Sequence, residues 1–95
     1  MLKIKAQIYL YKENGRKTPF ESGYRPLFDF KGSSSRYSGK IDLINKRIFL
    51  PGEIDEVYIT FANVDNLKVN DIFFFGEGLS RLGEGKVLAV MNNNE

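Results

Sequence analysis

The sequence contains no cysteine and no histidine. Without cysteine the chain cannot form a disulfide-stapled secreted scaffold, a thiolate metal site or a thiol redox centre. Without histidine it lacks the commonest general base and metal ligand of enzymes. No apolar run approaches the length of about 18 residues that a membrane-spanning helix needs, and the alternating N-terminus lacks the apolar core of a secretion signal. These absences favour a soluble, cytoplasmic protein that is not an enzyme.

The chain does have enough apolar side chains for one core. Of its 95 residues, 42% are hydrophobic and 14% are aromatic, a composition that is atypical of a disordered protein. This length suits one domain better than two. We therefore predict a single domain over residues 1–95, with a core of about residues 3–91 and a flexible tail at residues 92–95.

The small net charge of +2 hides an uneven distribution along the chain. Residues 1–47 carry 11 Lys or Arg and 4 Asp or Glu, whereas residues 48–95 carry 3 and 8. Such a split is found in proteins with a basic face for nucleic acid. The alternative is that strands from both halves interleave in one sheet, so that opposite charges mix and pair.

Side-chain polarity alternates with a period of two along most of the chain, which predicts β-strands. The clearest example is residues 3–11, where apolar side chains from Ile4 to Leu10 fall on one face. Further strands are predicted at about residues 27–31, 41–43, 57–61, 73–75 and 82–91. No segment has a helical period of useful length.

Glycine, proline and asparagine mark the connections between these strands. Turns or loops are predicted at Glu13-Asn14-Gly15, Gly32 to Ser35, Pro51-Gly52 and Asn63 to Asn66. Gly83 and Gly85 allow a bend or bulge near the start of the last strand. The run Phe73-Phe74-Phe75 indicates a strand that is buried on both faces or that closes a barrel.

About six short antiparallel strands predict an all-β fold, either a small barrel or a sandwich. We favour a closed barrel, because closure removes the unpaired edges that an apolar sheet would otherwise expose.

Three groups of residues could indicate catalysis or phosphate binding, but each has a simpler explanation. Ser33 to Ser35 have no histidine to activate them, and adjacent Asp55 and Glu56 should point to opposite faces of a strand. The glycine-rich residues 76–85 lack the spacing of a phosphate-binding loop and lead into a strand rather than a helix. We therefore predict no catalytic residue, no metal site and no cofactor.

Aromatic and basic residues are interleaved in the first 40 residues, from Tyr9 to Tyr37. Aromatic rings beside cations suit the stacking of bases in single-stranded or structured RNA. The alternative is that the tyrosines cover the barrel and that the lysines only keep the protein soluble.

Residues 15–30 read Gly-Arg-Lys-Thr-Pro-Phe-Glu-Ser-Gly-Tyr-Arg-Pro-Leu-Phe-Asp-Phe. This segment resembles the Gly-Arg-His-Thr-Pro-Phe and Gly-Tyr-Arg-Pro-Gln-Phe-Tyr-Phe motifs of the C-terminal β-barrel domain, the third domain, of elongation factor Tu. Leu50-Pro51-Gly52 is similar to the Met-Pro-Gly turn of that family. Glu77-Gly78 and Gly83-Glu84-Gly85 are similar to its glycine-rich segment before the final strand, so the resemblance covers about residues 4–90.

The resemblance implies a closed, six-stranded antiparallel Greek-key barrel that performs no chemistry. In elongation factor Tu this domain contacts the GTPase domain, the T stem of aminoacyl-tRNA and the nucleotide exchange factor. The present sequence has no counterpart of the GTPase domain, so we expect no GTPase activity of its own.

Three positions depart from the family motifs. Lys17 stands in place of the histidine, Leu27 in place of a tRNA-contacting glutamine, and Ser80 in place of an arginine, with Arg81 one position later. Ser38 keeps the hydroxyl group that precedes a glycine in the family sequence. The resemblance therefore implies the fold more firmly than it implies tRNA binding.

We predict a non-catalytic, translation-associated binding module that takes RNA such as tRNA, or a translation-related protein. Affinity for tRNA should be weak, because a lone barrel lacks the added contacts of linked domains. The alternative is a pure protein-interaction module, or a mimic of elongation factor Tu that titrates its partners or toxins. The candidate contact residues are Arg16, Lys17, Thr18, Phe20, Tyr24, Arg25, Lys31, Ser38 and Arg81.

Overall fold

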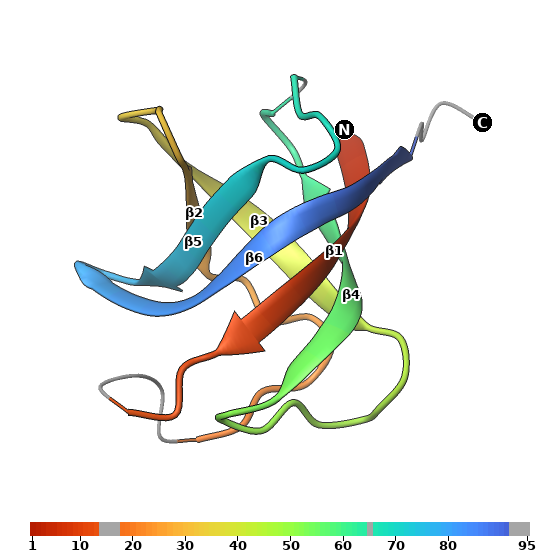
Figure 1. The fold of residues 1–95 in the computed structure, drawn as a ribbon, viewed down its shortest axis with the longest axis vertical. Helices are drawn as coiled ribbons and strands as arrows, with labels where there is room; N and C mark the ends of the chain where they lie inside the picture. The colour runs from red at the N-terminus through yellow and green to blue at the C-terminus, as the bar shows by residue number, and fades with distance from the viewer. Residues whose placement is uncertain (14–17, 65, 92–95) are drawn as a thin grey trace.

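The computed structural model of the protein describes residues 1–13, 18–64 and 66–91. These residues form strands and no helix, so none of them belongs to a helix that could cross a membrane. The strands are β1 (Leu2–Leu10), β2 (Leu27–Phe30), β3 (Arg36–Leu43), β4 (Ile54–Phe61), β5 (Ile72–Glu77) and β6 (Ser80–Met91) (Figure 1).

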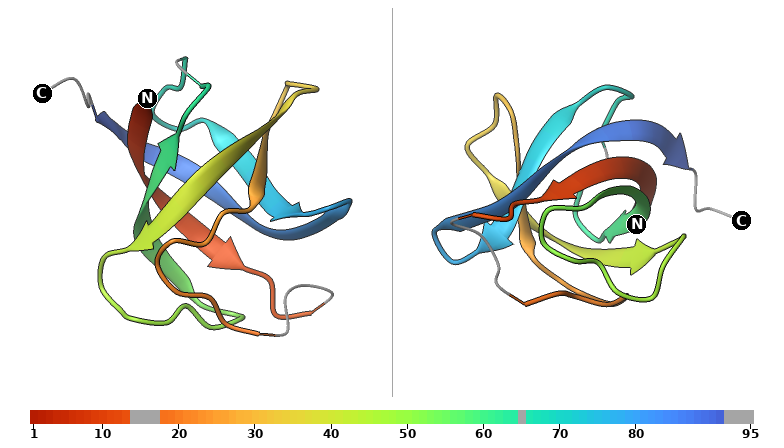
Figure 2. Two further views of the ribbon diagram at one scale, coloured as in Figure 1. Left: turned by 180° about the vertical axis from the view of Figure 1, so that it is seen from behind. Right: turned by 60° about the horizontal axis from the view of Figure 1, so that its bottom comes forward.

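The strands form one closed antiparallel barrel in the order β1-β4-β3-β2-β5-β6, and β6 pairs back to β1. Strands β2, β3 and β4 are neighbours in sequence and in space, and β5 returns to pair with β2, which is a Greek-key arrangement. Figure 2 shows the strands wrapping around a common interior. The predicted all-β, closed six-stranded barrel is confirmed.

The two halves of the sequence interleave in this barrel. Strand β1 pairs with β4 and β6 from the second half, and β2 pairs with β5. The uneven charge along the chain is therefore mixed on the surface, as the second interpretation of the charge pattern predicted. Ion pairs that join the halves are Lys5–Glu56 (3.2 Å), Lys46–Glu53 (3.0 Å), Lys46–Asp55 (3.3 Å) and Arg81–Asp29 (3.0 Å).

Aliphatic and aromatic side chains fill the interior of the barrel. The inward face of β1 is the one that alternation predicted, and its four apolar side chains are buried. Phe28 lies at the centre of a phenylalanine cluster, with its ring centroid 5.0 Å from that of Phe61 and 5.7 Å from that of Phe73. The interior is thus a packed core, as expected for so few strands.

Strand β5 is buried on one face only. Phe73 and Phe75 point inward and are almost fully buried, whereas Phe74 is half-exposed beneath the Arg81 guanidinium. The interpretation that the aromatic run is buried on both faces was therefore wrong. The other interpretation, a strand that takes part in closing a barrel, is confirmed.

The bulge predicted near the start of β6 is present. Gly76 is paired with Arg81 and Phe75 with Gly83, so Leu82 is the extra residue of β6. Leu82 and Gly83 are both buried, because a bulge interrupts the alternation of faces. Gly83 has a second role, since it lies opposite Phe75 and leaves room for that ring.

Two glycine turns form as the sequence predicts. The amide of Glu53 donates to the Leu50 carbonyl (3.1 Å), and Gly52 has φ of 90°, which fits a type II turn with Pro51 before it. The Gly32 turn after β2 likewise has a positive φ. Asn14, Gly15 and the tail at residues 92–95 lie outside the described residues.

An ion cluster joins the β3–β4 connection to the start of β4. The Leu50 amide and then the Lys46 ammonium lower the pKa of Glu53, and a hydrogen bond from Asn45 lowers the pKa of Asp55. Partial burial acts to lower the pKa of Lys46, but its hydrogen bonds to both carboxylates outweigh this effect and raise it. All three charged forms are therefore favoured by folding.

We expect the stability supplied by this cluster to be lost as pH falls below about 4.5. The ordinary pKa values of Glu53 and Asp55 are 4.5 and 3.8, and both are lower in the folded protein. Their contribution is thus fully present above these values and disappears as pH falls through the folded ones. Urea midpoints at pH 7 and pH 3.5 should differ less in Lys46→Met than in the wild type. The exposed Lys86→Met is the control, and an equal pH difference in all three proteins would contradict the assignment.

Candidate binding surface

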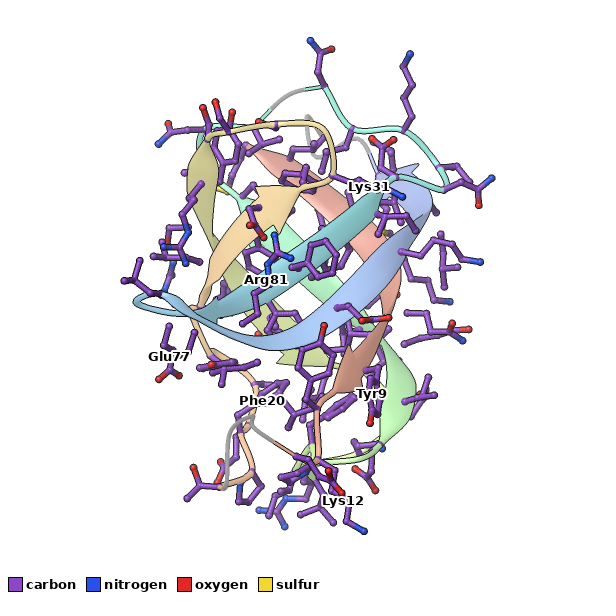
Figure 3. All side chains as sticks on the ribbon, turned by 60° about the vertical axis from the view of Figure 1, so that its left-hand side comes forward. Tyr9, Lys12, Phe20, Lys31, Glu77 and Arg81 are labelled. Carbon is purple, nitrogen blue, oxygen red and sulfur yellow. The ribbon has the colours of Figure 1, made fainter. Side chains whose placement is uncertain are left out.

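The predicted contact residues do not form one cluster. Arg16 and Lys17 lie outside the described residues. Exposed Thr18 follows them in the segment that leads to β2, and Arg25 and Ser38 lie on the outer surface beside β2 and on β3. Lys31 lies at the other end of the barrel, and Arg81 on the outer surface of β6 (Figure 3).

The structure places Phe20 in the core, so its prediction as a surface contact was wrong. Phe20 is 3% exposed, and its ring stacks on Phe49 with centroids 5.2 Å apart. The two residues also exchange backbone hydrogen bonds of 3.1 and 2.8 Å. Phe20 lies at the end of the barrel where β1 ends (Figure 3), and its ring and that of Phe49 are both buried there as part of the core. Burial of apolar area explains why a phenylalanine occupies this position.

Tyr24 joins this end of the barrel to the β5–β6 hairpin. Its half-buried ring packs on Phe20, with centroids 4.6 Å apart. Its hydroxyl donates a 2.6 Å hydrogen bond to Glu77 Oε2, and its backbone is bridged to Ile41 of β3. Tyr24 therefore holds three segments in place and presents only part of its ring to a partner.

Arg81 is held by two contacts on the outer surface. Its guanidinium carbon lies 3.9 Å from the Phe74 ring centroid, and Nη2 lies 3.0 Å from Asp29 Oδ2. The side chain remains 56% exposed, so the pair stabilises the fold only slightly. Because Asp29 already neutralises its charge, Arg81 contributes little to an anion-binding surface.

Arg25 belongs to a row of cations that crosses neighbouring segments. Tyr24 is paired with Ile41 and Leu27 with Ser38, and this constant register places Arg25 opposite Lys40. Lys40 is paired with Thr60, and Thr60 in turn with Lys3. We call Arg25, Lys40, Thr60 and Lys3 the cation row. Neighbouring strands are about 4.8 Å apart, so these side chains are neighbours on the outer surface; β2 and β3 come to the front in the left view of Figure 2.

The cation row borders a shallow depression of about 190 Å³, which Met1, Arg25, Lys40, Thr60 and Ala62 line. Arg25 is exposed and has no ion pair with any described residue. Lys40 is 3.5 Å from one carboxylate, Asp42 Oδ2, and both side chains are more than one third exposed. The side chains around the depression therefore carry a net positive charge.

Polar and aromatic groups flank the cation row. Lys3 Nζ lies 4.5 Å from the ring centroid of Tyr58, which keeps that ammonium on the outer surface. The exposed Ser38 hydroxyl is two residues from Lys40 and on the same face of β3. Cations beside hydroxyl donors are the groups that most often contact phosphates in nucleic acid complexes.

The sequence predicted Arg25 and Ser38 but missed Lys3, Lys40 and Thr60. Alternation does place these three on the outer face of their strands. Their proximity, however, depends on the pairing of β1 with β4 and of β4 with β3, which the sequence pattern does not specify. Knowledge of the strand order would have been enough to find them.

Within residues 1–13, 18–64 and 66–91, no three acidic side chains are grouped closely enough to hold a metal ion. A scan against models of known protein families finds no match for this chain.

Proposed function

We propose that the protein is a non-catalytic RNA-binding barrel, similar to the C-terminal domain of elongation factor Tu and associated with translation. The motif at residues 15–30 and the closed Greek-key barrel support the relationship. The observation that carries RNA binding is the cation row of Arg25, Lys40 and Lys3 around Thr60.

The cation row binds the phosphate backbone rather than the base sequence. The planar guanidinium of Arg25 can donate hydrogen bonds to two phosphate oxygens at once, and the lysine ammonium groups act as point charges. Ser38 and Thr60 add hydroxyl donors on the same surface. Binding of this kind releases counterions, so it weakens steeply with salt and does not depend on sequence.

The first test is the salt dependence of tRNA binding, measured by fluorescence anisotropy. Three phosphate contacts predict a log–log slope of about −2 to −3, which is a loss of roughly 15- to 60-fold in affinity between 50 and 200 mM salt. Lys3→Glu or Arg25→Glu should weaken binding to all RNA sequences and reduce the slope by about 1. Lys86→Glu is the matched control, with the same charge change at an exposed residue of β6.

Two outcomes contradict the proposal. One is the absence of binding to tRNA and to single-stranded RNA at 50 mM salt. The other is an equal loss of affinity in Lys86→Glu and Arg25→Glu, because the cation row would then have no special role.

A pure protein-interaction module, including a mimic that titrates partners or toxins of elongation factor Tu, is the second candidate. The observation that favours it is Leu79, which is 100% exposed at the tip of the β5–β6 hairpin. The hairpin is anchored by the Tyr24–Glu77 hydrogen bond, so this apolar side chain is presented on a fixed support. Large apolar side chains in such positions contribute to protein interfaces.

A further inference from the structure

The β2–β3 and β4–β5 connections rise from the same end of the barrel (Figure 1). Residues of both connections line a larger depression there. We call it the mouth pocket. Its volume of about 310 Å³ is at the small end of the range of ligand pockets, roughly 300–1,000 Å³. Barrel mouths are common places for such sites. Its lining includes Phe30, Lys31, Ser33, Tyr37, Asn63 and Asn66.

Two aromatic rings belong to the apolar lining of the mouth pocket, which also includes Val64, Leu67 and Ile72. Phe30 and Tyr37 are both partly buried, with ring centroids 6.0 Å apart and planes at 52°. Phe30 is fixed by two core rings, Phe61 at 5.7 Å and Phe73 at 5.9 Å. These rings are therefore held against the core, and their accessible surfaces can receive a flat ring.

The rim of the mouth pocket carries polar groups that the described residues leave available. The side-chain amides of Asn63 and Asn66 and the ammonium of Lys31 form no hydrogen bond or ion pair with any of these residues. Asp71, in contrast, accepts a 2.9 Å hydrogen bond from the Lys68 backbone amide. An asparagine amide both donates and accepts, as does the edge of a nucleobase.

The mouth pocket adjoins the cation row. Ala62 lines the depression beside the row, and the next residue, Asn63, lines the mouth pocket. Both follow the C-terminal end of β4. The two depressions are thus connected through consecutive residues of one segment.

We propose that the mouth pocket binds one unpaired nucleobase of an RNA strand whose phosphates lie on the cation row, an inference that rests on the proposed function. The base stacks on the Tyr37 ring, the inclined Phe30 ring contacts it from the side, and its polar edge meets Asn63 and Asn66. A wholly apolar ligand fits less well, because it would cover these amides without satisfying them. The pocket thereby adds contacts to bases that the phosphate-binding row cannot make.

The experiment compares two probes of equal charge, an adenosine RNA decamer and an abasic decamer with the same ribose-phosphate backbone. Stacking of one base is worth about 1–3 kcal/mol, so the wild type should bind the adenosine decamer about 5- to 150-fold more tightly. Tyr37→Leu keeps an apolar side chain but removes the aromatic face, and it should abolish this preference. Arg25→Glu should weaken both probes and keep the preference.

Asn66→Ala provides a second variant, because this exposed loop residue can be changed without affecting the core. Loss of its base contact should reduce the preference about 2- to 10-fold, as expected for one hydrogen bond. Circular dichroism melting checks the fold of each variant.

Equal affinity of the wild type for both decamers overturns the proposal that the mouth pocket binds a base, but it does not contradict phosphate binding by the cation row. A preference that survives in folded Tyr37→Leu and in Asn66→Ala also overturns it. Failure of both decamers to bind at 50 mM salt overturns the proposed function and the pocket together.

Discussion

Phe28→Ala is expected to lower the free energy of unfolding by about 3–5 kcal/mol. The Phe28 side chain is fully buried, and its ring contacts those of Phe61, Phe73 and Phe75 at centroid distances of 5.0, 5.7 and 6.0 Å. Removal leaves a cavity that these packed rings cannot close. A domain of this size is typically stable by about 5–15 kcal/mol, so the change should lower Tm by roughly 12–40 °C.

Phe74→Ala is the matched control, since it makes the same chemical change on the outer face of β5. It removes only a half-exposed ring and its contact with Arg81, so we expect a cost of about 1–2 kcal/mol. Urea unfolding followed by far-ultraviolet circular dichroism measures both variants. Equal costs would contradict the placement of Phe28 at the centre of the core.

Gly83→Ala is expected to cost about 3 kcal/mol through overpacking. A Cβ at Gly83 would lie 2.6 Å from the backbone carbonyl oxygen of Tyr9 and would collide with the Phe75 ring. Phe75 is 1% exposed, so its ring has no free space into which it can move. The barrel must therefore shift backbone or core to accommodate one methyl group.

Gly32→Ala is the control for this prediction. Gly32 has φ of 91° and nothing within 4 Å of its Cβ position, so alanine there carries backbone strain of about 1–2 kcal/mol and no collision. Adding Phe75→Leu to Gly83→Ala should give a combined cost smaller than the sum of the single costs, because the smaller side chain relieves the clash. Strict additivity in urea unfolding would show that the ring does not occupy the space above Gly83.

Strand β3 shows where alternation is insufficient as a guide. The sequence predicted a strand only at Ile41 and Leu43, whereas β3 runs from Arg36 to Leu43. The missing part contains Gly39, which faces inward but has no side chain to mark that face. A Cβ there would lie 2.8 Å from atoms of the Phe28 and Phe61 rings, so the pattern is interrupted because neighbouring rings fill the space.

Phe20 shows the corresponding difficulty outside the strands. Phe20 was predicted as a contact because it belongs to the motif that resembles elongation factor Tu and because aromatic side chains are common interface anchors. Its burial depends on Phe49, almost thirty residues away, which comes to the same end of the barrel and stacks on it. No local pattern in the sequence indicates that meeting.

The sequence by itself determined the all-β fold, the inward face of β1 and the glycine turns at Gly32 and Gly52. These features are local, since a period of two assigns each side chain to a face and glycine adopts a positive φ at low cost. Tertiary structure decided which strands are neighbours, and hence that Arg25, Lys40 and Lys3 form one row and that Phe30 and Tyr37 lie in one pocket. These juxtapositions follow from pairing between distant segments, which depends on how the whole core packs and which alternation within one strand does not specify.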